Sequence, residues 1–329
     1  MIHEDGELSG NAAENSSAKR IIAIKIDVDT ERGTRIGVPN LIQLFKQLDI
    51  PATFLFSLGP DNTGRAIKRI FRPGFLKKVS RSNVVGVYGF RTLLNGVLWP
   101  GPHIGRRCED IMRQTEKAGH EVGIHCYDHI RWQDNLHRWS SSEVFKEFRK
   151  ACDEFQRIFL HAPLTAGAAG WQANADSLAA YDAANLYYAS DARGIYPCFP
   201  KVGATQFKTL QIPSNLPTLD ELLGRAEFPL ASLDDYYLSL LRDDVVNVFT
   251  IHAEIEGMAY LSFFETFLKK AQQQGVEFQT LQTVAQCCLE HRDRIPVCEL
   301  IQGTVDGRSG TLAVLENEKG VTPDAYSQK

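Results

Sequence analysis

The chain has 329 residues, of which 43% are hydrophobic and 23% are charged, and its formal net charge at pH 7 is −4. This composition excludes a wholly disordered protein, because enough apolar residues are present to build a large core. The acidic balance argues against a nucleic-acid-binding protein. Seven cysteines without a repeated short spacing favour reduced thiols in a cytoplasmic protein over a disulfide framework.

The two ends of the chain differ in composition from its middle. Residues 1–19 are polar and lack the apolar stretch that a secretory signal peptide requires. We expect 1–19 and 311–329 to be disordered tails, and 20–310 to form one folded domain. No stretch of the sequence predicts a transmembrane helix.

Apolar runs and helical spacings alternate along this domain. Strands are predicted at 21–26, 51–56, 121–124, 187–189, 210–212, 245–251 and 276–280, and 165–171 is predicted as a strand or loop. Helices are predicted at 38–48, 109–118, 142–159, 177–184, 263–274 and 281–290. This alternation predicts an α/β protein whose parallel sheet is covered by helices, with its chemistry at the strand ends.

Two aspartates, Asp27 and Asp29, follow the first predicted strand. Because side chains alternate along an extended chain, both lie on the same side of it. Two close carboxylates can divide roles, one binding a metal and the other accepting a proton; alternatively, one of them caps the next helix. The run 27–30 is also similar to the nucleophile motif of haloacid-dehalogenase-type phosphatases, which needs an acidic pair just after a strand. Here the pair 243–244 precedes its strand, and that interpretation leaves the histidines below without a role.

Three histidines also stand at the ends of predicted strands. His125 and His129 follow 121–124, and neutral imidazoles are common ligands of zinc and similar ions. Two histidines and a carboxylate predict a divalent metal site, with Zn²⁺ favoured and Co²⁺, Mn²⁺ or Ni²⁺ also compatible, and with coordination positions open for water and substrate. His252 ends the most apolar strand. It is either a buried structural histidine or a general acid.

One segment, 62–108, contains no acidic residue and ten basic residues, interleaved with many apolar ones. Basic and apolar residues together, in a protein that is acidic overall, predict a surface that contacts an anionic membrane. The alternative is a long connection that packs on the domain with its basic side chains in water.

The order of Asp-x-Asp, His-x₃-His and a final Thr-Ile-His resembles the polysaccharide deacetylase family, also called the NodB-homology family. Further similar segments are 26–30, 32–35, 59–62, 81–83, 99–101, 120–125, 168–171, 190–194, 216–218 and 250–257. Together they extend over about residues 21–310. The resemblance implies a distorted, incomplete (β/α) barrel.

Within this family, the segments are most similar to deformylases of 4-deoxy-4-formamido-L-arabinose linked to undecaprenyl phosphate. The resemblance implies metal-dependent hydrolysis of the N-formyl group, giving formate and the 4-amino sugar lipid used in lipid A modification and polymyxin resistance. It also implies a peripheral protein on the cytoplasmic face of the bacterial inner membrane. Its expected partners are the lipid-linked sugar and the anionic membrane surface, with no nucleic acid.

The resemblance also implies roles for individual residues. Asp27 would be the general base and His252 the general acid. The metal would be held by Asp29, His125 and His129.

The sequence departs from the family pattern in two places. Val28 separates the aspartates that are usually adjacent, and 169–172 replaces the usual Arg-x-Pro-aromatic motif, whose arginine braces the base. We therefore expect Arg193, beside Asp191, to supply the brace, and Trp171 to form a wall of the sugar pocket.

Three further residues complete the predicted site. Arg81 is predicted to contact the substrate, and Glu254 and Glu256, which are close to His252, either contact the substrate or support the site residues from behind. Two alternative functions stay open at this point. One is a deacetylase of a soluble amino-sugar oligosaccharide, which would use the same catalytic residues. The other is a non-catalytic protein that binds a lipid-linked sugar.

Overall fold

The computed structural model describes residues 20–66 and 94–316. The predicted tail 1–19 and the predicted substrate contact Arg81 lie outside these residues, as does most of the predicted membrane-contact segment. Among the described residues, no helix is both long and apolar enough to cross a membrane.

Eight parallel strands of the described chain form the main sheet, in the order β10-β1-β2-β3-β4-β5-β8, and β9 pairs with the other edge of β1. The strands are β1 Ile21–Val28, β2 Thr53–Ser57, β3 Glu121–Cys126, β4 Thr165–Ala166, β5 Tyr188–Ala189, β8 Leu210–Gln211, β9 Asn247–His252 and β10 Glu277–Gln279. Within the described residues, no strand pairing joins β8 to β9. The sheet is therefore an open barrel, and the predicted fold class is confirmed.

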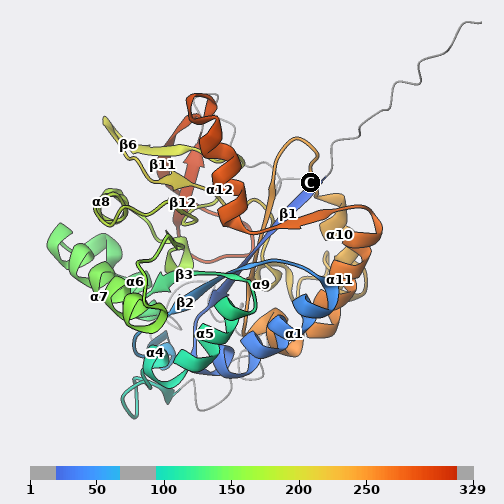
Figure 1. Cartoon of the computed structure of the whole chain (residues 1–329), viewed down its shortest axis with the longest axis horizontal. Coiled ribbons are helices and arrows are strands. Elements are labelled where there is room, and N and C mark those ends of the chain that lie inside the picture. Colours follow the sequence, from blue (N-terminus) through green and yellow to red (C-terminus); the bar gives the residue numbers. More distant parts are fainter. Residues whose placement is uncertain (1–19, 67–93, 317–329) are drawn as a thin grey trace, which may run out of the picture.

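Helices surround the outer face of this sheet (Figure 1). The longer ones are α1 Val38–Leu48, α5 Glu109–Lys117, α7 Ser141–Phe159, α8 Ala175–Ala183, α11 Leu261–Gln273 and α12 Leu281–Glu290. The shorter α-helices are α4 Ile104–Arg107, α6 His129–Asn135, α9 Leu219–Leu222 and α10 Leu233–Ser239. Single turns of π- or 3₁₀-helix are η1 Gly33–Gly37, η4 Leu136–Arg138, η5 Ala169–Trp171, η6 Leu230–Ser232, η7 Ile255–Ala259 and η8 Arg292–Arg294.

The two faces of β1 explain why a polar site lies inside the barrel. Ile22, Ile24 and Ile26 are fully buried in the main hydrophobic core, between the sheet and its helices. Because successive side chains of a strand point to opposite faces, Lys25 and Asp27 face the barrel interior instead. Strand β1 thus carries the core on one side and charged groups on the other.

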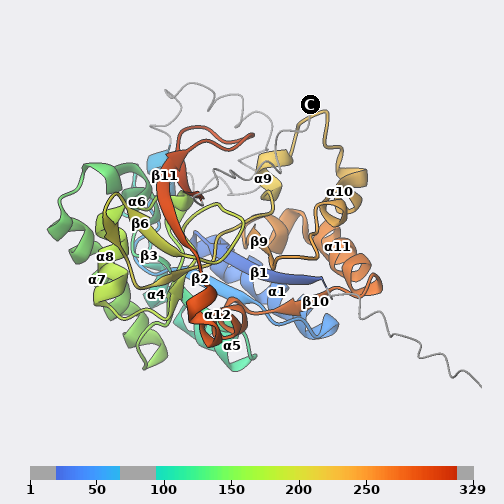
Figure 2. The ribbon, with the colours of Figure 1, turned by 90° about the horizontal axis from the view of Figure 1, so that it is seen from above.

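A second, smaller sheet lies with α12 at one end of the molecule (Figure 1, Figure 2). Its order is β12-β11-β6-β7, from strands β6 Phe199–Val202, β7 Thr205–Gln206, β11 Val297–Gly303 and β12 Leu312–Glu316. The backbone of Arg193 bonds to β12 on both sides, through the Ala313 carbonyl at 2.9 Å and the Leu315 N–H at 2.8 Å. The prediction of a disordered tail from residue 311 is therefore wrong for 312–316, because this short apolar run pairs with β11 and packs onto the barrel.

Candidate metal centre and active site

The candidate site lies at the carboxyl ends of three strands of the main sheet, β1, β3 and β9. Asp27, near the end of β1, is level with His252, the last residue of β9. Asp29 follows β1 directly, while His125 lies in β3 and His129 begins α6. Parallel strands end at a common edge, so residues separated by more than 200 positions meet there. The sequence prediction that these residues gather at the strand ends is confirmed.

Asp29, His125 and His129 form the group that suits a metal ion, with donor atoms that all lie within 4.8 Å of one another. The Asp29 Oδ1 atom is 3.2 Å from His125 Nε2 and 3.4 Å from His129 Nε2. That oxygen is buried and has no hydrogen-bond partner. Such an atom is costly to bury unless something binds it. A carboxylate and two imidazoles fit Zn²⁺, and Co²⁺, Mn²⁺ and Ni²⁺ accept the same donors.

Contacts around the ligands orient them for this role. The His125 Nδ1 atom is 2.7 Å from the Gly167 carbonyl, so this nitrogen donates the bond and Nε2 is the atom that faces Asp29. At the start of α6, Asp128 accepts a bond from the Arg131 N–H at 3.0 Å and one from Asn62 at 2.7 Å. These bonds fix the first turn of α6, and with it the position of His129.

Electrostatics keep the Asp29 carboxyl ionised. Burial acts to raise its pKa, but His129, His125 and His252 together hold the pKa well below its usual value. An ionised carboxylate is the form that a cation binds. The local charge therefore also suits a metal centre.

Asp27 occupies the position expected of a general base. Its Oδ1 atom is buried without a hydrogen-bond partner and lies 3.6 Å from His125 Nδ1. Its Oδ2 atom is paired with Lys25 Nζ at 3.4 Å. Lys25 is fully buried and also donates to the Ser190 carbonyl at 3.0 Å. The cation that orients Asp27 is therefore Lys25, on the same strand.

Sequence reasoning missed Lys25, although a signal was present. A lysine in the run Ile-Ile-Ala-Ile-Lys-Ile is unusual for a buried strand, since lysine is rarely buried without a partner. Its spacing of two from Asp27 places both side chains on one face. A lysine on the face of the catalytic aspartates predicts an ion pair.

The prediction that Arg193 braces Asp27 is wrong. The buried Arg193 guanidinium forms an ion pair with Glu221 at 3.1 Å and donates to the Leu216 carbonyl at 2.9 Å. It also lies over the Trp171 ring, 5.2 Å from the centroid. These contacts tie the loop after β5 to α9 and to the segment before it, so Arg193 stabilises the fold.

Asp191 also makes structural contacts. It accepts bonds from the Ala168 N–H at 2.6 Å, Gln211 at 2.8 Å and the Tyr181 hydroxyl at 3.2 Å. Burial raises its pKa to about 6, against the opposing effects of Gln211, Lys25 and these other bonds. Both carboxylate oxygens are thus engaged in holding neighbouring strand ends. The predicted catalytic role of Asp191 is not supported by these contacts.

Trp171 does not line an open sugar pocket. Only 2% of its surface is exposed, and its ring is approached by three cations, Lys25 at 5.4 Å, Arg193 at 5.2 Å and Arg308 at 4.5 Å. Leu312 of β12 packs on it as well. The predicted role in substrate contact is wrong because the second sheet covers this side chain. Trp171 instead joins the two sheets.

Glu254 and Glu256, predicted either to contact the substrate or to support the site, are buried and hold backbone groups. Glu254 Oε1 accepts bonds from the Asp29 N–H at 3.1 Å and from both the N–H and hydroxyl of Thr30, at 2.9 and 2.7 Å. A β-carbon at Gly33 would collide with this carboxyl group. Glu256 accepts from the His252 N–H at 2.9 Å. The two glutamates position Asp29 and His252 from behind, so these contacts agree with the predicted supporting role and not with the alternative of direct substrate contact.

His252 is half-buried at the end of β9, and its Nδ1 atom has no hydrogen-bond partner. Burial acts to lower its pKa, but the carboxylates of Asp220, Asp29, Asp27 and Glu256 outweigh that effect and raise it. A histidine that retains its proton near neutral pH can donate it to a leaving group. The environment of His252 therefore suits a general acid.

Comparisons with known proteins agree with this geometry. The family model for polysaccharide deacetylases matches residues 14–189. Over 293 residues, the chain is 37% identical to "Probable 4-deoxy-4-formamido-L-arabinose-phosphoundecaprenol deformylase ArnD" of Shewanella sediminis, covering 89% of this chain and 93% of that protein. It is 34% identical over 283 residues to the protein of the same name in Wigglesworthia glossinidia brevipalpis, covering 85% and 97%.

Solved structures support the fold. The crystal structure of a polysaccharide deacetylase candidate from Mycobacterium smegmatis matches with a TM-score of 0.61 at 15% identity, over 88% of this chain and 96% of that one. The phosphatase interpretation of the aspartates is excluded, because they lie beside two histidines in a deacetylase fold. The chain therefore belongs to the polysaccharide deacetylase family and is a hydrolase that acts on an amide.

Proposed function

We propose that the protein hydrolyses the N-formyl group of 4-deoxy-4-formamido-L-arabinose linked to undecaprenyl phosphate. Water adds to the formyl carbon, the carbon–nitrogen bond breaks, and the products are formate and the lipid-linked 4-amino sugar. The observation that carries the proposal is the grouping of Asp29, His125 and His129 beside the buried carboxylate of Asp27. The names of relatives that are 34–37% identical over most of the chain support the substrate.

The chain's own residues supply proton transfer and orientation. Asp27 takes the proton of the attacking water on its free Oδ1, while Lys25 holds Oδ2 in place. A divalent metal at Asp29, His125 and His129 would supply Lewis acidity toward the formyl carbonyl and the attacking water. Lys25 has a second bond to the Ser190 carbonyl, so its position does not depend on Asp27 alone.

His252 completes the reaction from the opposite strand. It donates a proton to the departing nitrogen, which makes the amine a better leaving group. Its backbone N–H is fixed by Glu256, and its Nδ1 atom is free of internal bonds. The register of β9 against β1 places His252 level with Asp27, so acid and base approach the same amide group from two adjacent strands.

The proposed cellular setting is the cytoplasmic face of the bacterial inner membrane, where the product would serve lipid A modification and polymyxin resistance. The described end of the 62–108 segment supports membrane contact. Val97, Leu98 and Trp99 form an apolar tip with exposed fractions of 50%, 67% and 43%. Exposed apolar residues in a basic segment favour insertion into an anionic bilayer surface.

Product identity tests this function directly. Purified protein is incubated either with the lipid-linked formamido sugar or with a soluble N-acetylated amino-sugar oligosaccharide, and formate and acetate are quantified. We expect formate from the first substrate and little acetate from the second. Acetate from the soluble oligosaccharide alone would establish the deacetylase alternative, and no release from either would favour a binding protein.

A further inference from the structure

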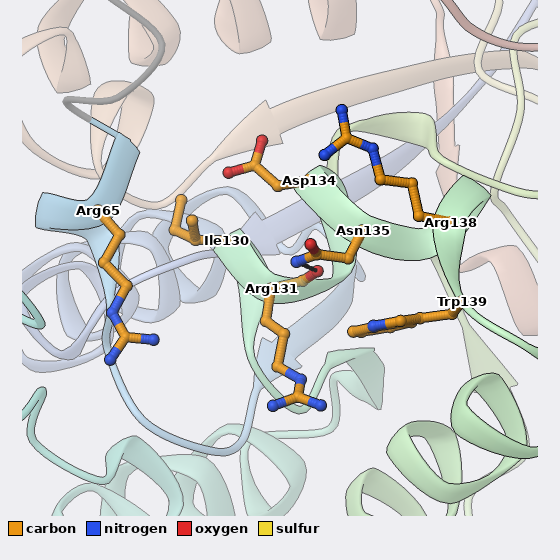
Figure 3. A pocket seen from close by; sticks show the side chains of 7 residues that line it. All are labelled: Arg65, Ile130, Arg131, Asp134, Asn135, Arg138 and Trp139. Atoms are coloured by element: carbon orange, nitrogen blue, oxygen red, sulfur yellow. Dashed lines mark hydrogen bonds between the residues drawn. The ribbon is translucent and has the colours of Figure 1, made fainter.

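A basic pocket lies beside α6, the helix that begins at the metal ligand His129. It has a volume of about 560 Å³ and is lined by Arg65, Arg131 and Arg138, with Asp134 as its one acidic residue and Trp139 at its side (Figure 3). Three guanidinium groups and one carboxylate line it, so the lining carries a surplus of positive charge. No step of the proposed reaction uses these arginines.

One wall of the pocket is formed by the helix that carries a metal ligand. Helix α6 starts at His129, and its next residues, Ile130 and Arg131, line the pocket. The backbone that positions His129 therefore also positions these pocket residues, so the metal site and the pocket share this helix.

The arginines are held in place by the fold. The Arg131 guanidinium lies over the Trp139 ring at 5.3 Å, and its Nε is 3.6 Å from Glu147. Asn135 donates to the Arg131 carbonyl at 2.8 Å, and Arg65 Nε donates to the Gly96 carbonyl at 3.0 Å. Figure 3 shows the side chains of Arg65 and Arg131 extending in the same direction. Such preorganised guanidinium groups suit a phosphate, which they bind through paired N–H donors.

We propose that this pocket binds the phosphate that links the sugar of the substrate to its lipid, an inference that rests on the proposed function. The formamide and the phosphate occupy opposite ends of one sugar ring, so the phosphate binds one sugar away from the metal. Arg131, two residues beyond His129 on α6, is the pocket arginine closest to this ligand in the chain.

The order of features along the protein matches the order of parts in the substrate. Arg65 links the pocket to the apolar tip, because its bond to Gly96 joins it to the turn that carries Val97 and Leu98. Lipid tail, phosphate and formamido sugar would then meet the apolar tip, the arginines and the metal centre in sequence. A lipid carrier entering from the membrane thus delivers its sugar to the catalytic residues.

The test compares two water-soluble substrates without any membrane. One is the formamido sugar joined through its phosphodiester to a short prenyl group, and the other is its methyl glycoside, which has no phosphate. For Arg65→Gln and Arg131→Gln, we expect KM for the phosphodiester to rise about tenfold, because each variant loses a charge-assisted hydrogen bond to the phosphate. We expect kcat to stay unchanged. Kinetics on the methyl glycoside should not change.

Matched variants separate phosphate binding from general charge and stability. Arg149→Gln removes an exposed arginine of α7 outside the pocket and should leave both substrates unaffected. Arg131→Lys keeps the charge without the planar fork and should restore part of the affinity. Glu147 also pairs with Lys150 at 2.8 Å, so replacing Arg131 does not leave this buried carboxylate without a partner, and we expect both variants to fold.

The outcomes distinguish a failure of the phosphate-site proposal from a failure of the proposed function. An unchanged KM for the phosphodiester, or an effect seen only with anionic vesicles, would overturn the substrate phosphate site while leaving the function intact. If the wild-type protein releases formate from neither substrate, the proposed function fails. In that case, calorimetry measures the affinity of the protein for the prenyl phosphodiester. An affinity about tenfold weaker in Arg131→Gln would support the phosphate site, and an unchanged affinity would overturn it.

Discussion

Buried charged groups have different partners on the two sides of the barrel interior. Around the candidate metal centre, Asp27 and Asp29 each keep a buried oxygen without a hydrogen-bond partner. Around Trp171, by contrast, Arg193 is matched with Glu221 and stacked on the indole ring. The first arrangement costs stability and creates binding capacity, while the second supports the fold. Of these two regions, the one with unpartnered aspartate oxygens is the candidate reactive side.

The largest expected effect is a loss of kcat when the proposed base is replaced. Asp27→Asn retains the shape of the side chain but removes its ability to accept a proton, so kcat should fall about 10²- to 10⁴-fold. Metal content, measured by elemental analysis, should stay at the wild-type value, because Asp27 is not among the grouped ligand residues. Loss of metal together with activity would mean that Asp27 is itself a ligand.

The next effect concerns the structural side. Arg193→Ala breaks a buried ion pair and should lower the free energy of unfolding by about 3–5 kcal/mol, measured by urea denaturation. The matched control is Lys269→Ala, which removes an exposed ion pair with Glu265 and should cost less than about 1 kcal/mol. Equal costs for the two variants would contradict the structural role of Arg193.

The third prediction concerns Glu256 and the dependence of protein stability on pH. Burial raises the pKa of this carboxyl from its usual 4.5 to about 7, so the folded state retains a proton that the unfolded state loses. Stability should therefore decline as pH rises from 4.5 through 7, by up to about 3 kcal/mol relative to Glu256→Gln. Parallel stability curves for the two proteins across this window would show that Glu256 is ionised in the fold.

The smallest expected effect lies at the junction of the two sides, where Lys25 contacts both Asp27 and Trp171. Lys25→Met leaves the base without its orienting cation, and kcat should fall about 10- to 100-fold with metal content unchanged. Lys25→Arg should restore part of the rate. If Lys25→Met unfolds the protein and Lys25→Arg restores only stability, the residue acts in folding alone.

The sequence predicted the reactive side better than the structural side, for a physical reason. Asp29, His125 and His129 stand at strand ends, and strand ends of a parallel sheet converge wherever the strands lie in the chain. The partner of Arg193 could not be inferred this way. Glu221 comes from a short helix 28 residues later, and its approach depends on how the intervening loops pack.

The same reasoning explains the other predictions that were open or wrong. Glu254 and Glu256 stand close to His252 in the chain, and position alone does not say whether a carboxylate faces substrate or a backbone N–H. The burial of Trp171 comes from β12, a run of only five residues that needs β11 to become a strand. Short strands stabilised by distant partners leave little local signal.

The most direct test of the proposed chemistry measures bound metal and formate release on the same samples. Wild-type protein, a chelated sample and Asp29→Ala are each assayed with the lipid-linked formamido sugar, before and after addition of Zn²⁺. We predict that formate release follows metal content, stops on chelation and returns with Zn²⁺ in the wild-type protein only. Full formate release from metal-free protein, or from Asp29→Ala without bound metal, would contradict the assignment of Asp29, His125 and His129 as the metal centre.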